Sequence, residues 1–230
     1  MARSEGLNRS CTMYTLLKRV FDFLASGLLL VVLAPLLVGL GVAIRLSSRG
    51  PALFRQERAG KAGGPFTFYK FRTMRLDVDP FGPSPKSGDD PRLTRLGRFL
   101  REYSLDELPQ LVNIFNGDMS LVGPRPLYVA QMAEWDERQR QRLSVKPGLT
   151  GLAQISGRGT LTREEKLELD VRYVERASLG LDARILLATF GQVFAHRGIY
   201  EKRYSQTEWT RGQASSDPSS AAQRGKRLAE

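Results

Sequence analysis

The stretch FLASGLLLVVLAPLLVGLGVAI, residues 23–44, contains no charged side chain. As an α-helix it would rise about 1.5 Å per residue and reach roughly 33 Å, enough to cross the hydrocarbon core of a bilayer. A cleaved signal peptide is a poorer interpretation, because the apolar run is too long and no small-residue cleavage site follows before IRLSSRG. The sequence therefore predicts a membrane helix, which we assign to residues 20–46.

Two features of this helix favour a bent shape. Pro35 lies in its middle, where proline removes a backbone hydrogen bond and bends a helix. Basic residues flank both ends, namely Lys18, Arg19, Arg45, Arg49, Arg55 and Arg58. The positive-inside rule assigns both flanks to the cytoplasm, which a straight span cannot satisfy. We therefore expect a re-entrant helix that enters and leaves through one leaflet. An ordinary kinked membrane anchor is the alternative.

The whole chain of 230 residues is strongly basic, with a net charge of +11 and a pI near 10.1. Such a charge predicts polyanionic partners: nucleic acid, anionic lipid or phosphorylated small molecules. The one cysteine, Cys11, excludes an internal disulfide, and the one histidine, His196, excludes a multi-histidine metal site. We expect His196, which follows an apolar stretch, to be structural or solvent-exposed. Any chemistry must therefore rest on carboxylates, arginines and a hard cation.

Residues 47–204 have the pattern of one compact domain of the α+β class, mainly α. Strand-like runs over 51–60 and 65–74 flank the glycine-rich tip AGKAGG and predict a β-hairpin. Residues 76–91 are rich in proline, glycine and acid, and predict a mobile loop. Apolar periodicity predicts helices over 92–102, 127–143, 163–178 and 182–195. Residues 1–19 form a separate N-terminal segment, and the tail 205–230 is expected to be disordered.

The predicted helix 92–102 is amphipathic. Its leucines recur at helical spacing, and its arginines at 92, 95, 98 and 101 form a broad basic face. A solvated face is the usual meaning of such a pattern. A helix at the surface of an anionic membrane fits equally well, because the chain already has a membrane helix.

Residues 104–110, SLDELPQ, place two adjacent carboxylates, Asp106 and Glu107, in this basic chain. From Ser104 to Glu107 the sequence matches the capping box S-x-x-E, which favours a helix N-cap. Pro109 fits better with a helix that begins one or two residues later. On either interpretation both acids lie on a first helical turn, where the amide dipole is expected to keep Asp106 ionised. An ionised carboxylate is a usable nucleophile toward phosphorus.

Two further segments carry groups suited to phosphate. In NGDMSLVGPRPL, residues 116–127, prolines restrict the backbone on both sides of Arg125, and a fixed guanidinium suits bidentate phosphate binding. A rigid surface loop in which Arg125 pairs with a nearby acid is an equally good interpretation. The segment VKPGLTGLAQISGRGT, residues 145–160, matches neither the P-loop nor the dinucleotide fingerprint. Its glycines and Arg158 can still present amides and a guanidinium to phosphate.

Four segments together resemble a known family: YKFRTM (69–74), TRLGRFLREYSLDELPQLVNIFNGDMSLVGPRPL (94–127), KPGLTGLAQISGR (146–158) and DVRYVERASLGLD (170–182). They are similar to the bacterial sugar transferases, the monotopic, PglC-like phosphoglycosyl transferases. The resemblance covers roughly residues 14–200 and includes a re-entrant helix broken at a proline, here Pro35. It implies transfer of sugar-1-phosphate from a UDP-sugar to polyprenyl (undecaprenyl) phosphate, with release of UMP. The alternative is a membrane-tethered polyanion-binding module without catalysis.

The resemblance also implies roles for particular residues. Asp106 would attack the sugar-bearing phosphate and form a covalent phosphosugar–aspartyl intermediate. Glu107 would be the partner acid that helps to hold Mg²⁺, together with Asp106, or that handles protons. The residues expected to hold phosphate or to line the site as cations are Arg101, Arg125, Arg158 and Lys70.

Other implications concern the surroundings of the enzyme. Asp170 and Asp182 match family positions, and either helix capping or ion pairing would explain them. The expected partners are the UDP-sugar, the polyprenyl phosphate acceptor and membrane lipid, and no nucleic acid is expected. Whether the protein forms a homodimer is left open. The expected location is the cytoplasmic face of the bacterial inner membrane. A minimal member without a further membrane domain is expected, and the sugar is not specified.

Overall fold

The computed structural model describes residues 2–79 and 85–195, with side chains over 13–79 and 85–192. His196, the tail 205–230 and part of the predicted loop 76–91 lie outside these residues. The described chain is mainly helical with a small antiparallel sheet, as the sequence predicted.

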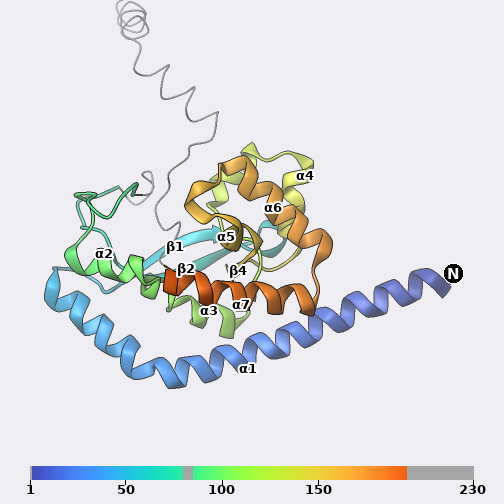
Figure 1. Ribbon diagram of the computed structural model, residues 1–230, viewed down its shortest axis with the longest axis horizontal. Helices are drawn as coiled ribbons and strands as arrows, with labels where there is room; N and C mark the ends of the chain where they lie inside the picture. The colour runs from blue at the N-terminus through green and yellow to red at the C-terminus, as the bar shows by residue number, and fades with distance from the viewer. Residues whose placement is uncertain (1, 80–84, 196–230) are drawn as a thin grey trace, which may run out of the picture.

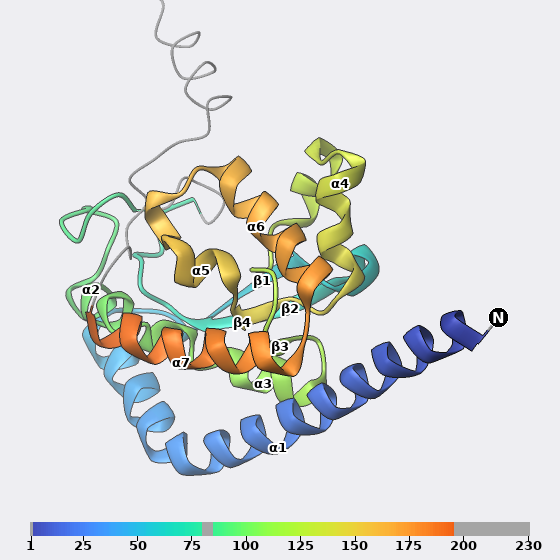
Figure 2. The ribbon, with the colours of Figure 1, turned by 45° about the vertical axis from the view of Figure 1, so that its right-hand side comes forward.

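The chain begins with one long helix, α1 (Ala2–Ser47), which contains Pro35. It covers both the predicted N-terminal segment and the predicted membrane helix. Figures 1 and 2 show that α1 bends sharply in its light-blue second half, so that it follows the rest of the molecule. Met13–Ser47 is long and apolar enough to cross a membrane. Its outward side chains are apolar and exposed, as at Leu28 (66%), Val31 (75%) and Val38 (66%).

Both halves of α1 contact the same domain. In the first half, Arg19 donates hydrogen bonds to the carbonyls of Ile114 (2.7 Å) and Phe115 (2.9 Å). At the far end, Ile44 is buried against Phe71 and Leu100. One stripe of the helix thus packs on protein along most of its length, while the other faces outward.

The predicted hairpin is confirmed. β1 (Leu53–Ala59) and β2 (Pro65–Phe71) are antiparallel, and the tip between them forms a short 3-10 turn, η1 (Lys61–Gly63). The main core lies between this sheet and the helices. α1 packs on α3 (Gln110–Asn116), and α3 packs in turn on β2.

The predicted helices are confirmed in three places and wrong in one. The confirmed elements are α2 (Arg95–Glu102), α6 (Arg163–Arg176) and α7 (Leu179–Ala195). The predicted helix 127–143 is instead three short elements, η3 (Val129–Glu134), α4 (Glu137–Arg140) and η4 (Gln141–Ser144). The break occurs because buried Trp135 is extended (φ −87°, ψ 136°) and Asp136 starts a new helix as its N-cap.

A second, two-stranded sheet was not predicted. β3 (Ser120–Val122) pairs in parallel with β4 (Gly148–Thr150), and α5 (Leu152–Ser156) and η5 (Arg158–Thr160) follow β4. α7 lies against both strands. This sheet brings the two predicted phosphate-binding segments next to each other in space.

Candidate active site

The acidic pair lies on a short 3-10 turn, η2 (Leu105–Glu107), between α2 and α3. The predicted capping box is wrong. Ser104 is in the left-handed region (φ 56°), whereas an N-cap residue is normally extended, and its side chain caps nothing. Its hydroxyl accepts a hydrogen bond from Arg158 (3.1 Å) instead. α3 begins only after Pro109, so the acids do not lie on the first turn of a full helix.

Asp106 is 6% exposed. Among the residues that the structure describes, none donates a hydrogen bond to its carboxylate. Burial raises the pKa of Asp106 to about 6, and the neighbouring Glu107 adds to the rise, while Lys70 and Arg101 oppose it. Burial therefore outweighs the helix dipole that was expected to favour the ionised form. With a pKa of about 6 the group is still roughly nine-tenths ionised at pH 7.

The pKa of Glu107 is shifted in the opposite direction. Burial alone would raise its pKa, but the charge and the hydrogen bond of Arg125 lower it, with help from Arg158 and Lys70, to about 2. The Arg125 guanidinium donates to Oε1 of Glu107 at 2.7 Å. The two adjacent acids therefore have well-separated pKa values, a pattern that suits different chemical roles. Glu107 is fixed and permanently ionised, while Asp106 has no such partner.

The predicted cations converge on this pair from separate elements. Lys70 projects from β2, Arg101 lies in the last turn of α2, and Arg158 begins η5 with a positive φ of 54°. Burial lowers the pKa of Lys70 to about 8, although Asp106 opposes this. Burial likewise lowers the pKa of Arg158. The site therefore gathers more positive than negative charge, which favours a polyanionic ligand.

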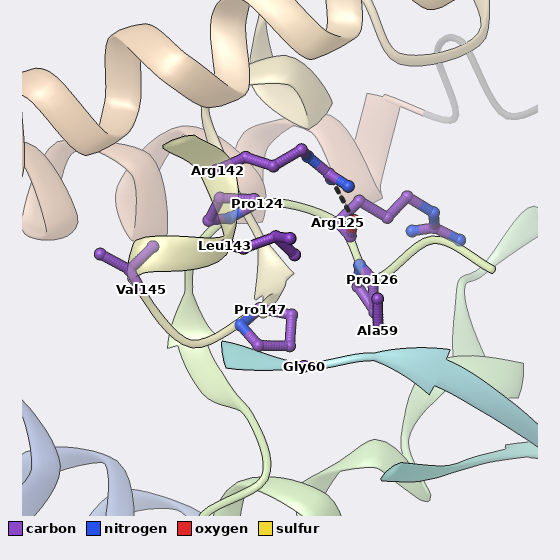
Figure 3. Close-up of a pocket in the computed structure, with 9 residues that line it drawn as sticks. All are labelled: Ala59, Gly60, Pro124, Arg125, Pro126, Arg142, Leu143, Val145 and Pro147. Atoms are coloured by element: carbon purple, nitrogen blue, oxygen red, sulfur yellow. Dashed lines mark hydrogen bonds between the residues drawn. The ribbon is translucent and has the colours of Figure 1, made fainter. Parts of the chain in front are cut away.

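The loop that carries Arg125 is held by its neighbours on the second sheet. The Gly123 amide donates to Thr150 (2.9 Å), and the Gly148 amide donates to the Pro124 carbonyl (2.8 Å). Pro124 and Pro126 are buried, whereas the Arg125 side chain is 47% exposed. Figure 3 shows this loop above the end of β1. The suggested pairing with an acid does occur, and the acid is Glu107.

The acidic pair also fits a Mg²⁺ ion. In the described part of the chain, no group of three or more His, Cys, Asp or Glu residues gathers to bind a metal. Mg²⁺ is, however, usually held by one or two carboxylates together with water and substrate phosphate. The unpartnered carboxylate of Asp106 beside ionised Glu107 is a suitable pair of hard oxygen donors.

The two aspartates left open by the sequence form ion pairs. Asp182 accepts hydrogen bonds from Lys18 (2.6 Å), Tyr14 (3.0 Å) and Tyr173 (2.7 Å), and so connects α1 to α6 and α7. Asp170 pairs with Arg142 at 2.6 Å, and both side chains are less than 5% exposed. Sequence reasoning did not identify Arg142, because one more arginine in a basic, apparently helical segment carries no signal.

Comparison with known proteins identifies the family of this chain. The sequence matches the bacterial sugar transferases over residues 13–196. It is 44% identical over 193 residues to "Uncharacterized sugar transferase EpsL" of Bacillus subtilis, covering 84% of this chain and 95% of that protein. It is 47% identical over 196 residues to a "UDP-glucose:undecaprenyl-phosphate glucose-1-phosphate transferase" of Caulobacter vibrioides, covering 80% and 72%. A protein of the same name from Escherichia coli is 41% identical over 204 residues, covering 85% of this chain and 43% of that protein. The chain belongs to the bacterial sugar transferase family.

Proposed function

We propose that this protein transfers sugar-1-phosphate from a UDP-sugar to polyprenyl phosphate, and that it does so in two steps through Asp106. The observation that carries the proposal is a buried carboxylate without a hydrogen-bond partner in the described chain, surrounded by cations. The names of the relatives from Caulobacter vibrioides and Escherichia coli support the same kind of donor and acceptor.

In the first step, an oxygen of the Asp106 carboxylate forms a bond to the sugar-bearing phosphorus. The bond from this phosphorus to the bridging oxygen breaks, and its electron pair leaves with UMP. In the second step, a phosphate oxygen of the polyprenyl acceptor attacks the same phosphorus. The bond to Asp106 breaks, which regenerates the carboxylate and yields the polyprenyl diphosphate sugar. Neither step needs an oxidant or a reductant.

The cations of the site address the main obstacle to this reaction, the repulsion between two anions. A carboxylate about 4 Å from one phosphate charge is repelled by about 4 kcal/mol, taking an effective dielectric of about 20. The charges of Lys70, Arg101 and Arg125 act on Asp106, and those of Arg125, Arg158 and Lys70 act on Glu107, so both acids share a common set of counter-charges. Cations held in place before the substrate arrives stabilise the charge that develops on the leaving UMP.

Mg²⁺ is part of the proposal, with Asp106 and Glu107 as the residues that would hold it. When bound, the ion would neutralise charge on the diphosphate and on the departing UMP. Chelation of divalent cations with EDTA should therefore lower the rate of UMP release by more than about a hundredfold. Excess Mg²⁺ should restore the rate. An unchanged rate after EDTA treatment would show that protein cations alone suffice.

We also propose that α1 is re-entrant and that the catalytic domain lies on the cytoplasmic face of the bacterial inner membrane. The support is that both halves of α1 rest on one domain and that the helix bends between them. Exposed apolar side chains on α2 (Phe99, 46%) and α7 (Phe190, 67%) suit the interfacial position expected for amphipathic helices. The acceptor phosphate could then reach Asp106 from the headgroup level while its isoprenoid tail stays in lipid.

The topology has a direct test. Reporter tags fused to the N-terminus and to the C-terminus should both be accessible from the cytoplasm, because a re-entrant helix returns to the leaflet by which it entered. The measurement is protease protection of each tag in sealed inverted and right-side-out vesicles. Tags on opposite sides would establish a crossing helix and contradict the proposal.

Release of UMP in the absence of acceptor tests the two-step function. Purified protein mixed with UDP-sugar and Mg²⁺ should release about one UMP per active site, and polyprenyl phosphate should then start continuous turnover. A binding module would release none. UMP release that begins only when the acceptor is added would exclude an intermediate formed before acceptor binding.

A further inference from the structure

Arg142 is a buried arginine that the proposed reaction does not use. Arg142 belongs to η4, and its side chain is 3% exposed. The central carbon of its guanidinium lies 4.8 Å from the centroid of the Trp135 ring. Both Nε (3.1 Å) and Nη2 (2.6 Å) donate to the same oxygen of Asp170 on α6. This is a fully desolvated ion pair, set behind the loop of the candidate site.

Arg142 of this pair holds the backbone carbonyl of Arg125. Nη2 of Arg142 also donates to the Arg125 carbonyl at 2.5 Å, a contact that is drawn in Figure 3. Burial raises the pKa of Asp170 to about 6, while Arg142 and the backbone amide of Arg125 lower it. Oδ1 of Asp170 is buried without a hydrogen-bond partner of good geometry in the described chain, so Asp170 acts on the Arg125 peptide mainly through Arg142.

Stability alone is a poor explanation for this arrangement. Buried ion pairs can often be replaced by apolar side chains of similar volume without loss of stability. An apolar pair could fill the same space beside Trp135, but it could not donate a hydrogen bond to a carbonyl. What the charges add is a fixed position for the peptide of Arg125.

That position determines where the Arg125 guanidinium can reach. The residue stands between two buried prolines, so its backbone has few alternative conformations once the carbonyl is fixed. Its side chain leaves the loop toward Glu107, 2.7 Å away. A small pocket lined by Arg142, Leu143 and Pro147 borders this loop.

We propose that Arg142, anchored by Asp170, is a positioning residue that fixes the Arg125 peptide and thereby aims the Arg125 guanidinium at the phosphate site. The proposal rests on the proposed function for its catalytic consequence. The structural part of the proposal, that Arg142 orders the Arg125 side chain, is independent of that function, because this order can be measured without substrate.

The test is the apolar pair Arg142→Met with Asp170→Leu, which removes both buried charges together. The double variant should unfold within a few degrees of the wild type, because no charge is left buried without a partner. UMP release should nevertheless be about 10- to 100-fold slower, since a small misplacement of a positioning group has an effect of this size. Arg140→Met is the matched control, because the Arg140 side chain donates, within the described residues, only to the carbonyls of Trp135 and Met132.

A double-mutant cycle separates positioning from general damage. If Arg142 acts through Arg125, the apolar pair should slow UMP release by less than about twofold when added to Arg125→Ala. Additive losses would overturn the proposal. Arg142→Lys is the second variant, since it keeps a counter-ion for Asp170 but lacks the planar fork that reaches two partners. It should show an intermediate loss of rate, and a wild-type rate would also contradict the proposal.

The substrate-free readout is ¹⁵N relaxation of the Arg125 Nε–Hε group, assigned by its disappearance in Arg125→Lys. The order parameter of this group should fall in the apolar pair and stay unchanged in Arg140→Met. Unchanged order in the apolar pair would overturn the inference, whatever the enzyme does. If the wild-type protein releases no UMP, the proposed function is contradicted. The order parameter of Arg125 would then still test whether Arg142 positions it.

Discussion

Asp106→Asn should reduce the rate of UMP release from a UDP-sugar by more than about a thousandfold. A neutral amide cannot form the bond to phosphorus that an ionised carboxylate forms, so the first step has no nucleophile. The thermal stability of the folded protein should be unchanged. The side chain is buried and is not held by hydrogen bonds in the described chain, and an amide of the same shape avoids the desolvation that raises the pKa of Asp106. Stopped-time assays of UMP and a thermal melt would measure both effects.

The matched control for this variant is Asp89→Asn. It removes the same charge from an exposed residue that pairs with Arg98 at 3.0 Å. Its activity and melting temperature should remain close to those of the wild type. If Asp106→Asn released UMP at the wild-type rate, the assignment of the nucleophile would be wrong, whatever the control did.

Arg125→Ala should lower the rate of UMP release by about a hundredfold to a thousandfold. Two losses combine in this variant. The guanidinium can no longer bind phosphate, and the pKa of Glu107 should rise, because Arg125 is the main group that lowers it. Arg125→Lys should recover only part of the rate, since an ammonium group cannot form a planar bidentate contact. Initial rates at several donor concentrations would separate binding from turnover.

Arg138→Ala is the matched control for Arg125→Ala. Arg138 is equally exposed, and it also forms ion pairs, with Glu168 (3.0 Å) and Glu175 (3.1 Å), but these lie on the surface of α6. The control should change neither the rate nor the dependence on donor concentration. Equal losses in the two variants would point to a general effect of net charge on donor attraction and would contradict a specific role for Arg125.

The elements with strong local signals could be predicted from the sequence. The apolar run 23–44 and the strands on either side of AGKAGG have patterns that few other structures produce, and both are present. The predicted helix 127–143 failed because its interruption depends on Trp135, which is extended and buried in the folded chain. β3 and β4 are only three residues each and meet across a long loop, so no periodicity marks them.

The composition of the site was predicted, but its physical state was not. Asp106, Arg125 and Arg158 were candidates from the residues themselves, the resemblance to the family added Lys70 and Arg101, and the structure brings them together. The capping box failed because Arg158, from a distant segment, takes the hydroxyl of Ser104. Asp106 is mostly ionised at pH 7 as predicted, but its pKa is raised, because a local dipole argument ignores burial, which only the folded chain determines. Arg142 was missed for the same reason, since its partner Asp170 is 28 residues away.

Intact-protein mass spectrometry after mixing with UDP-sugar and Mg²⁺, without acceptor, tests the two-step reaction most directly. The account predicts a mass increase of one sugar phosphate, located by peptide mapping at Asp106 and lost when polyprenyl phosphate is added. A protein that makes lipid-linked product at full rate while never carrying a sugar phosphate would contradict it, because the acceptor would then attack the donor in a single displacement.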